Sequence, residues 1–195
     1  TQFRYRLSDK QKELLFQSAY LYTSFADLLQ IEDYRSLVQD LDAKGIQLVM
    51  DIEKNALGMD CDVMDVLSLA SILFINEQAD EVLSKRFGSE YRQRLSDNEC
   101  LIVLTKAEKG SEIYTADEDI KVNAYPVEVV DTTGAGDTYN VSFLLAFNRG
   151  ETLEMAGRFA SIAASLGIKE RGARSICKHV AEVELIFSES ALLAK

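Results

Sequence analysis

The sequence is short of basic residues, with 21 lysines and arginines against 32 aspartates and glutamates and a net charge of −11. A protein that binds the phosphate backbone of nucleic acid needs a broad basic surface. A pI near 4.6 is not compatible with such a surface. We therefore exclude nucleic acid as a partner and interpret the acidity as favouring solubility.

Cysteine is scarce as well. The three cysteines, Cys61, Cys100 and Cys177, are widely spaced and form no C-x-x-C pair. Each lies in an apolar or helical context, where a buried, unreactive thiol is commoner than a metal ligand or a nucleophile. The pattern argues against a secreted domain held together by disulfides.

Long hydrophobic runs are missing too. No apolar run reaches the roughly 18 residues of a membrane-spanning helix, and residues 1–9 contain no apolar signal core. We therefore expect no membrane partner and a cytoplasmic location. Because the chain starts with Thr1 rather than Met, we interpret it as part of a longer protein, whose own start could contain a signal.

Short apolar runs alternate with stretches of helical periodicity in the first half of the chain. Runs that are apolar on both faces, alternating with helices, predict a parallel sheet covered on both sides, which is an α/β fold. The predicted strands are 19–24, 46–51, 72–76 and 100–105. The predicted helices start at Ser8-Asp9 or lie around 37–43, 63–70 and 79–87.

The rhythm changes after Thr105. Three short alternating runs, 112–115, 120–124 and 127–130, predict antiparallel or edge strands, with Pro126, the single proline, between the last two. The predicted helices here are 137–148, 152–166 and 180–188. Since no repeat, linker or low-complexity segment interrupts the 195 residues, we expect a single domain.

The most informative segment is residues 129–140, VVDTTGAGDTYN. Gly134 and Gly136 allow a tight turn whose N–H groups can approach a ligand closely. Free N–H groups at the start of the following helix form an anion site, which phosphoryl transfer requires. Asp137, in the same first turn, would be held ionised by the helix dipole and is the candidate general base.

The alternative is that this turn only caps a helix, with Asp137 as an ordinary first-turn acid. We favour the functional interpretation because Asp131, Thr132 and Thr133 precede the glycines and Asp137 follows them. Two other phosphate motifs are excluded. No G-x-x-x-x-G-K-[ST] is present, and Tyr139 occupies the position where the dinucleotide fingerprint requires glycine or alanine.

DTTGAGDTYN closely resembles the C-terminal signature of the ribokinase-like carbohydrate kinases, the phosphofructokinase-B type. The order of other landmarks is similar to that family: Asp51, Asn76, 105–110 and Gly172-Ala173. The resemblance spans the whole chain and covers roughly the C-terminal two-thirds of a typical member. The N-terminal portion with the sugar contacts and the lid strands would precede Thr1, so the sugar cannot be identified.

The resemblance implies a ribokinase-like three-layer α/β/α fold with a mostly parallel sheet, transferring the γ-phosphate of ATP to a hydroxyl of a sugar or sugar acid with Mg²⁺. It implies that Asp137 is the base and that the backbone of Gly134, Ala135 and Gly136 forms the anion hole. The nucleotide-binding positions that it implies are Asn76, Thr105, Gly110 and Ser161. A homodimer is left open.

Several of these positions have simpler explanations. Asp131 and Thr133 resemble residues that hold a monovalent cation such as K⁺ in some members, but their side chains could equally cap the turn. Thr105 and Ser161 could be ordinary packing residues. For His179, the only histidine, we expect a solvated or capping role rather than catalysis.

The chain also departs from the family pattern. The family's Asn-x-x-Glu appears as Asn76-Glu-Gln-Ala79, so the expected acid is missing; either Asp80 or Glu77 replaces it, as we expect, or a water molecule bridges the gap. Ala107 lies where glycine is common. These departures motivate a second hypothesis from another class, a catalytically weak relative that binds nucleotide and has a regulatory or scaffolding role.

Overall fold

The computed structural model describes the backbone of residues 3–193 and the side chains of residues 3–176 and 179–189. The chain divides into two compact units. The N-terminal unit comprises Thr1–Leu104 and Tyr114–Glu118, and the C-terminal unit comprises Thr105–Ile113 and Asp119–Lys195. In the described part of the chain, no helix combines the length and apolarity needed to cross a bilayer.

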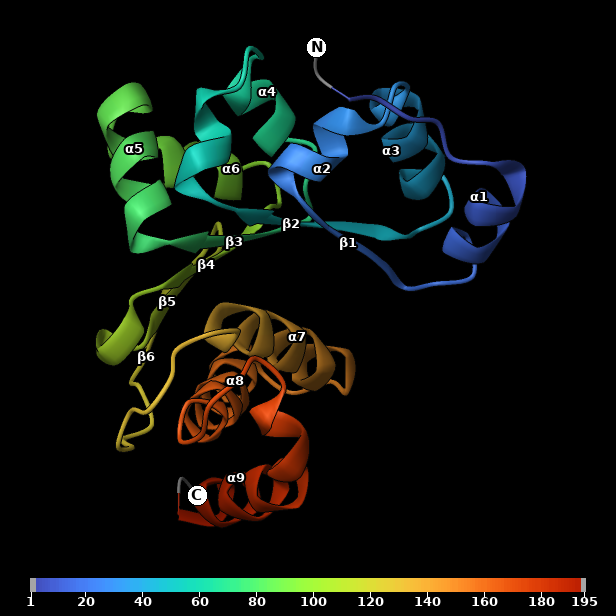
Figure 1. The fold of residues 1–195 in the computed structure, drawn as a ribbon. Coiled ribbons are helices and arrows are strands. Elements are labelled where there is room, and N and C mark those ends of the chain that lie inside the picture. Colours follow the sequence, from blue (N-terminus) through green and yellow to red (C-terminus); the bar gives the residue numbers. More distant parts are fainter. Residues whose placement is uncertain (1–2, 194–195) are drawn as a thin grey trace. The chain divides into compact units, whose positions relative to one another are not determined.

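The N-terminal unit is built on parallel strands, as predicted. The strands follow one another in chain order: β1 (Tyr20–Ser24), β2 (Gln47–Ile52), β3 (Ile72–Asn76) and β4 (Leu101–Thr105). Strands β1 and β3 both pair in parallel with β2. The helical segments are α1 (Asp9–Leu15), α2 (Phe25–Gln30), α3 (Tyr34–Asp42), η1 (Lys54–Gly58), α4 (Val63–Leu67), α5 (Glu77–Phe87) and α6 (Tyr91–Ser96). Helices α2 to α5 lie on one face of strands β1 to β3 (Figure 1).

Both faces of β2, β3 and β4 are buried along their middle residues, which explains the apolar runs there, whereas β1 is only partly buried. On β2, Leu48 and Met50 belong to the core that the N-terminal unit's helices share. Val49, which points to the opposite face, is also fully buried but lies outside that core. Phe74 on β3 repeats this relationship between Leu73 and Ile75.

Short polar residues fix where the helices of this unit begin. Ser8 forms a capping box with Gln11 and starts α1, as the sequence predicted. The side chain of Asp62 accepts a hydrogen bond from the backbone of α4, and that of Asn76 does the same for α5. Asn76 is therefore both the last residue of a buried strand and the cap of the following helix.

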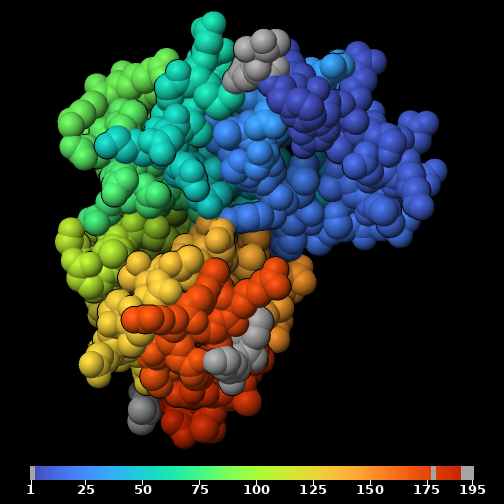
Figure 2. Space-filling model, in the orientation of Figure 1, coloured from blue at the N-terminus to red at the C-terminus, as the bar shows by residue number. Residues whose placement is uncertain are grey.

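The C-terminal unit places two short neighbouring strands beside a group of helices. Its elements are η2 (Ala107–Lys109), β5 (Ser111–Tyr114), β6 (Asp119–Val122), α7 (Ala135–Asn148), α8 (Leu153–Gly167), η3 (Ser175–Lys178) and α9 (Val180–Leu193). Helix α8 packs against α7, β6, η3 and α9. In Figure 2, the orange to red residues of α8, η3 and α9 lie against one another on the face shown.

The strand predicted for residues 127–130 is wrong. This stretch has no regular structure, and the side chains of Val129 and Val130 are more than half exposed. The N–H groups of Val130 and Asp131 both donate to the carbonyl of Ile168, just after α8, instead of to a strand. The alternating valines resemble a strand pattern, but the backbone of Val130 and Asp131 hydrogen-bonds to the residue that follows α8 instead of to another strand.

Candidate phosphate-binding and catalytic site

The turn before α7 requires glycine at position 134. Gly134 is the N-cap of α7 in the left-handed conformation, with φ 77° and ψ 8°. A Cβ on Gly134 would lie 2.9 Å from the Cβ of Ala173 and 3.0 Å from its carbonyl oxygen. Both the backbone angle and the close approach exclude a side chain here. Helix α7 therefore begins at Ala135, two residues before the sequence prediction.

The first turn of α7 presents N–H groups that the protein does not use. The N–H of Ala135 donates to the carbonyl of Thr132 at 3.1 Å, and that of Thr138 donates to Gly134 at 2.9 Å. In the described part of the chain, the N–H groups of Gly134, Gly136 and Asp137 have no recorded acceptor. The anion hole of Gly134, Ala135 and Gly136 stays a prediction, and of its three N–H groups that of Ala135 is used within the turn.

Space is open in front of this turn. A Cβ built on Gly136 would meet nothing within 4 Å, and the side chain of Asp137 is exposed. An anion can therefore approach the free N–H groups of a 14-residue helix with a carboxylate from the same turn beside it.

The side chain of Asp131 accepts hydrogen bonds from the turn before α7 and from Gly172. Its Oδ1 accepts hydrogen bonds from the N–H of Thr133 at 3.0 Å and from the Thr133 hydroxyl at 2.7 Å. Its Oδ2 accepts one from the N–H of Gly172 at 2.9 Å. The Thr133 side chain, together with these backbone donors, lowers the pKa of Asp131 to about 2. The structure thus shows both side chains capping the turn. No cluster of three or more metal-binding side chains occurs among the described residues.

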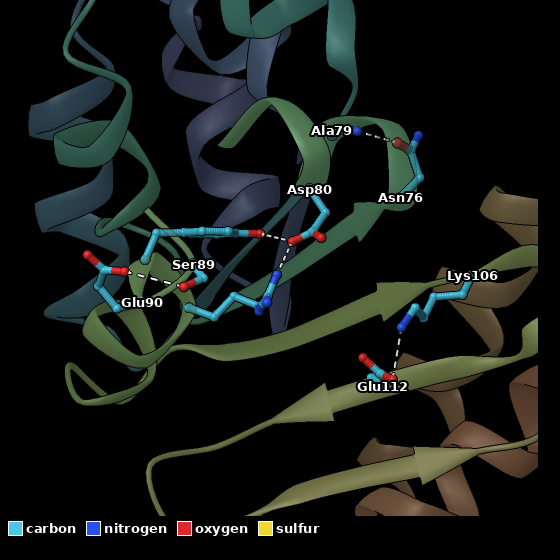
Figure 3. Close-up of polar contacts among 9 residues, drawn as sticks. Asn76, Ala79, Asp80, Ser89, Glu90, Lys106 and Glu112 are labelled. Atoms are coloured by element: carbon cyan, nitrogen blue, oxygen red, sulfur yellow. Dashed lines mark hydrogen bonds and ion pairs between the residues drawn. The ribbon is translucent and has the colours of Figure 1, made fainter. Parts of the chain in front are cut away.

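The loop after β4 is closed by its own backbone. The N–H of Lys106 donates to the carbonyl of Gly110 at 2.8 Å, and the Lys106 ammonium pairs with Glu112 at 2.9 Å (Figure 3). Gly110 has φ 89°, and a Cβ there would lie 2.0 Å from the carbonyl oxygen of Val122. Thr105 starts this loop and Gly110 ends it, so the structure brings these two predicted residues together.

Ser161 has a structural role in α8. It is buried, and its hydroxyl donates to the carbonyl of Asn123 at 3.2 Å while accepting from the N–H of Tyr125 at 2.8 Å. These contacts fasten the segment after β6 to the helix. Since both hydrogen-bonding capacities of the hydroxyl are used, the geometry favours the packing explanation over a contact with adenine.

Asn76 lies in the N-terminal unit, at the end of β3. Its Oδ1 accepts a hydrogen bond from the N–H of Ala79 at 2.9 Å (Figure 3). This orientation leaves the amide N–H₂ as the donor available to a phosphate. Ala79 itself is fully buried in the core of the unit. The position of the missing acid is thus part of the hydrophobic core in this chain.

Asp80 is not available to replace that acid. Its Oδ1 accepts hydrogen bonds from the Tyr91 hydroxyl at 2.6 Å and from the guanidinium of Arg92 (Figure 3). Burial and the contact with Asp80 together raise the pKa of Tyr91. These contacts hold Asp80 Oδ1 within the N-terminal unit, and Glu77 is the other acid in the first turn of α5.

His179 takes part in ion pairs rather than in this site. Its Nδ1 lies 2.9 Å from Glu182 and its Nε2 lies 3.5 Å from Glu170. Its hydrogen bond, more than any other contact, lowers the pKa of Glu182. His179 precedes α9, where a partnered side chain stabilises the helix start.

Two contacts around the turn could not be read from the motif. Ala173 lies against Gly134, and the Tyr139 hydroxyl in the second turn of α7 hydrogen-bonds with Ser111 at 2.7 Å. The sequence indicates the Gly172-Ala173 pair as a family landmark but gives it no role. It indicates Tyr139 only as the residue that rules out the dinucleotide fingerprint. A tyrosine hydroxyl on the buried side of a helix was the available signal, because such a group needs a partner.

Comparison with known proteins identifies the family of this chain. The profile of the pfkB family carbohydrate kinases matches residues 2–180. The chain therefore belongs to the pfkB family of carbohydrate kinases.

Individual relatives are similar over part of their length. A nucleoside kinase from Methanothermobacter thermautotrophicus is 34% identical over 109 residues, which is 56% of this chain and 35% of that protein. The structure of Arabidopsis thaliana ribokinase complexed with ribose and ATP is 25% identical, with a TM-score of 0.72 over 90% of this chain and 60% of that one. A ribokinase structure from Thermotoga maritima, 23% identical with a TM-score of 0.74, covers 94% and 60%. These similarities confirm the ribokinase-like α/β fold, and this chain spans little more than half of the structures it resembles.

Proposed function

We propose that this chain carries the catalytic turn and nucleotide-binding segments of an ATP-dependent kinase, which phosphorylates a hydroxyl of a sugar or sugar acid. The observation that carries the proposal is the start of α7, where unused N–H groups and the Asp137 carboxylate occupy one helical turn. Phosphoryl transfer depends chiefly on positioning and on stabilising the charge of the moving group, and this turn offers both.

In the proposed reaction, the N–H groups of Gly136 and Asp137 hold the oxygens of the transferred phosphoryl group. The Asp137 carboxylate accepts the proton of the acceptor hydroxyl as its O–H bond breaks. The new O–P bond forms while the bond between the γ-phosphorus and the bridging oxygen of ATP breaks, and ADP leaves with that bonding pair. The Asn76 amide would donate a hydrogen bond to the phosphates.

Mg²⁺ would neutralise charge on the phosphates of bound ATP. The residues present fit an ion held mainly by those phosphates and by water, because Ala79 is apolar and Asp80 is committed to Arg92. Glu77 is the acid left to contact its water shell. K⁺ beside Asp131 and Thr133 would need Asp131 to share oxygens that already accept three hydrogen bonds.

The second candidate function is a nucleotide-binding relative with little turnover. It is favoured by a specific observation, the replacement of the family's acid by a fully buried Ala79. For the acceptor, the nucleoside kinase among the relatives motivates adding nucleosides to any panel of sugars and sugar acids.

The test is Asp137→Asn in the protein as it is encoded. We expect kcat to fall by about 10²–10⁴, the usual contribution of a positioned base, while the Kd for ATP is unchanged. Glu154→Gln, which removes the first-turn acid of the neighbouring helix α8, is the matched control and should keep wild-type turnover.

Retention of more than about a third of the wild-type kcat by Asp137→Asn, with chemistry limiting turnover, would contradict the proposed base. If the wild-type protein is stabilised by ATP but phosphorylates no member of the panel, the nucleotide-binding alternative is correct.

A further inference from the structure

A buried polar contact of α7 lies one turn after the glycines at its start. The Tyr139 hydroxyl and the Ser111 hydroxyl are 2.7 Å apart. Tyr139 is 6% exposed and Ser111 is 2% exposed, so the pair is shielded from water. Burial raises the pKa of Tyr139 to about 12.

Tyr139 and Asp137 lie on nearly opposite sides of α7. Successive residues of an α-helix are about 100° apart, so two residues correspond to about 200° around the axis. Asp137 is accordingly exposed, whereas Tyr139 and Phe143 are buried and stack with ring centroids 6.5 Å apart. A rotation of the first turns that moved the tyrosine hydroxyl would move the carboxylate by a similar arc in the other direction.

Ser111 connects this contact to the loop after β4. It follows Gly110 directly and is the first residue of β5. On one side of Ser111, Gly110 cannot move freely because it lies against the backbone of residues 122–124. On the other side, Glu112 forms an ion pair with Lys106. The Ser111 hydroxyl is therefore a fixed point at the end of the candidate nucleotide loop.

The tyrosine hydroxyl lies close to Gly157 of α8. A Cβ built on Gly157 of α8 would lie 3.5 Å from that oxygen and 2.8 Å from Val122 Cγ2. The small residue on α8 thus makes room for the hydroxyl between the helix and β6. A hydroxyl packed closely between these elements has little room to move, and a positioning contact requires such restriction.

We propose that Tyr139 is a positioning residue, whose hydrogen bond to Ser111 fixes the rotation of the first turns of α7 and thereby aims the Asp137 carboxylate relative to the loop of residues 105–110. The inference rests on the proposed function, because it assigns Tyr139 a role through Asp137. In this proposal the Tyr139 ring packs against Phe143, and the hydroxyl has the separate role of fixing the helix rotation.

The test compares Tyr139→Phe, Ser111→Ala and the double variant in the protein as it is encoded. We expect Tyr139→Phe to keep the ring packing and to lower kcat about 10-fold, since small displacements of a reacting group are costly, while the KM for ATP changes less than about twofold. Ser111→Ala should give a similar loss, and the double variant should lose no more than either single one. Ser111→Thr, which retains a hydroxyl, should restore most of the activity.

Tyr91→Phe is the matched control, because it also removes a buried tyrosine hydroxyl that hydrogen-bonds to another side chain, that of Asp80. It should lower the Tm and leave kcat unchanged. A readout independent of activity is hydrogen exchange of the amides of residues 138–140, which should be faster in Tyr139→Phe than in wild type.

Wild-type kcat in both Tyr139→Phe and Ser111→Ala, or an equal loss in Tyr91→Phe, would overturn the positioning role. Additive losses in the double variant would do the same. If Asp137→Asn is inactive and Tyr139→Phe is normal, only this inference fails; if Asp137→Asn itself is active, the proposed function fails.

Discussion

Asp131 and Gly172 connect two distant parts of the C-terminal unit, because the Asp131 Oδ2 accepts the Gly172 N–H at 2.9 Å. The neighbouring Ala173 lies against Gly134. The turn that starts α7 is therefore supported by the segment between α8 and η3. Its shape depends on residues nearly 40 positions further along the chain, as well as on its own glycines.

This support should depend on pH in a defined window. The pKa of Asp131 lies near 2 in the folded chain, below its ordinary value of 3.8. A lowered carboxylate pKa contributes stability that is complete above the ordinary value and is lost as the pH falls through the folded value. We expect Asp131→Asn to flatten the decline of Tm between about pH 4 and pH 2.

The measurement is a series of thermal unfolding curves across that range for wild type and Asp131→Asn. Asp117→Asn, which removes an exposed carboxylate from the turn between β5 and β6, serves as the charge control and should follow wild type. Superimposable Tm–pH curves for wild type and Asp131→Asn would show that the capping contacts do not stabilise the protein.

The two glycines of the motif should respond differently to substitution. Gly134→Ala combines an unfavourable positive φ with a contact on Ala173, so we expect a loss of about 1–3 kcal/mol in the free energy of unfolding. Gly136→Val places its side chain in open space and should leave Tm nearly unchanged while weakening ATP binding. Calorimetric Kd values with matched Tm measurements test this, and normal ATP binding by Gly136→Val would refute the anion-site assignment.

Gly110 should be the least replaceable glycine of the loop after β4. In Gly110→Ala the new methyl group would collide with the carbonyl of Val122, so we expect a loss of more than about 2 kcal/mol in the free energy of unfolding. Gly150→Ala is the matched control, since Gly150 has φ 87° but nothing within 4 Å of its Cβ position. It should cost only about 1 kcal/mol. Equal losses in urea denaturation would mean that the backbone angle, not the collision, decides.

Ala79→Glu should destabilise the protein rather than restore a missing acid. Ala79 is fully buried in the N-terminal unit's core, and an uncompensated buried carboxylate costs several kcal/mol, so we expect a loss of about 3 kcal/mol or more. Gln78→Glu adds the same charge at an exposed neighbour and should stay within about 0.5 kcal/mol of wild type. An Ala79→Glu variant with wild-type Tm and a shifted Mg²⁺ midpoint would show that this position faces the metal.

The parallel strands and the presence of a helix after the glycine turn were predictable because their signals are local. The strands β2 and β3 contain unbroken apolar runs, residues 48–50 and 72–75, and the motif around Gly134 has few alternative structures. The absence of a strand at 127–130 was not predictable, because the partner of Val130 is the carbonyl of Ile168, far along the chain.

The same distinction applies to the site. Gly134, Gly136 and Asp137 are adjacent in sequence, so their chemistry is visible in the motif. The commitment of Asp80 to Arg92 and the burial of Ala79 arise from packing between α5 and other elements, which no spacing rule records. The loss of Ala135 as a donor depends on a single turn hydrogen bond to Thr132.

Two serines of α8 hydrogen-bond to the backbone of the segment after β6, as the backbone of a neighbouring strand would. Ser161 serves Asn123 and Tyr125, and Ser165 donates to the Tyr125 carbonyl at 2.8 Å. Over evolutionary time, position 161 should accept only short side chains that can both donate and accept, and position 165 only short side chains that can donate. An apolar residue at position 161 would leave the Asn123 carbonyl and the Tyr125 N–H without this partner and release the segment. The residues tolerated at this position should therefore be set by the hydrogen bonds of the backbone and not by the ligand.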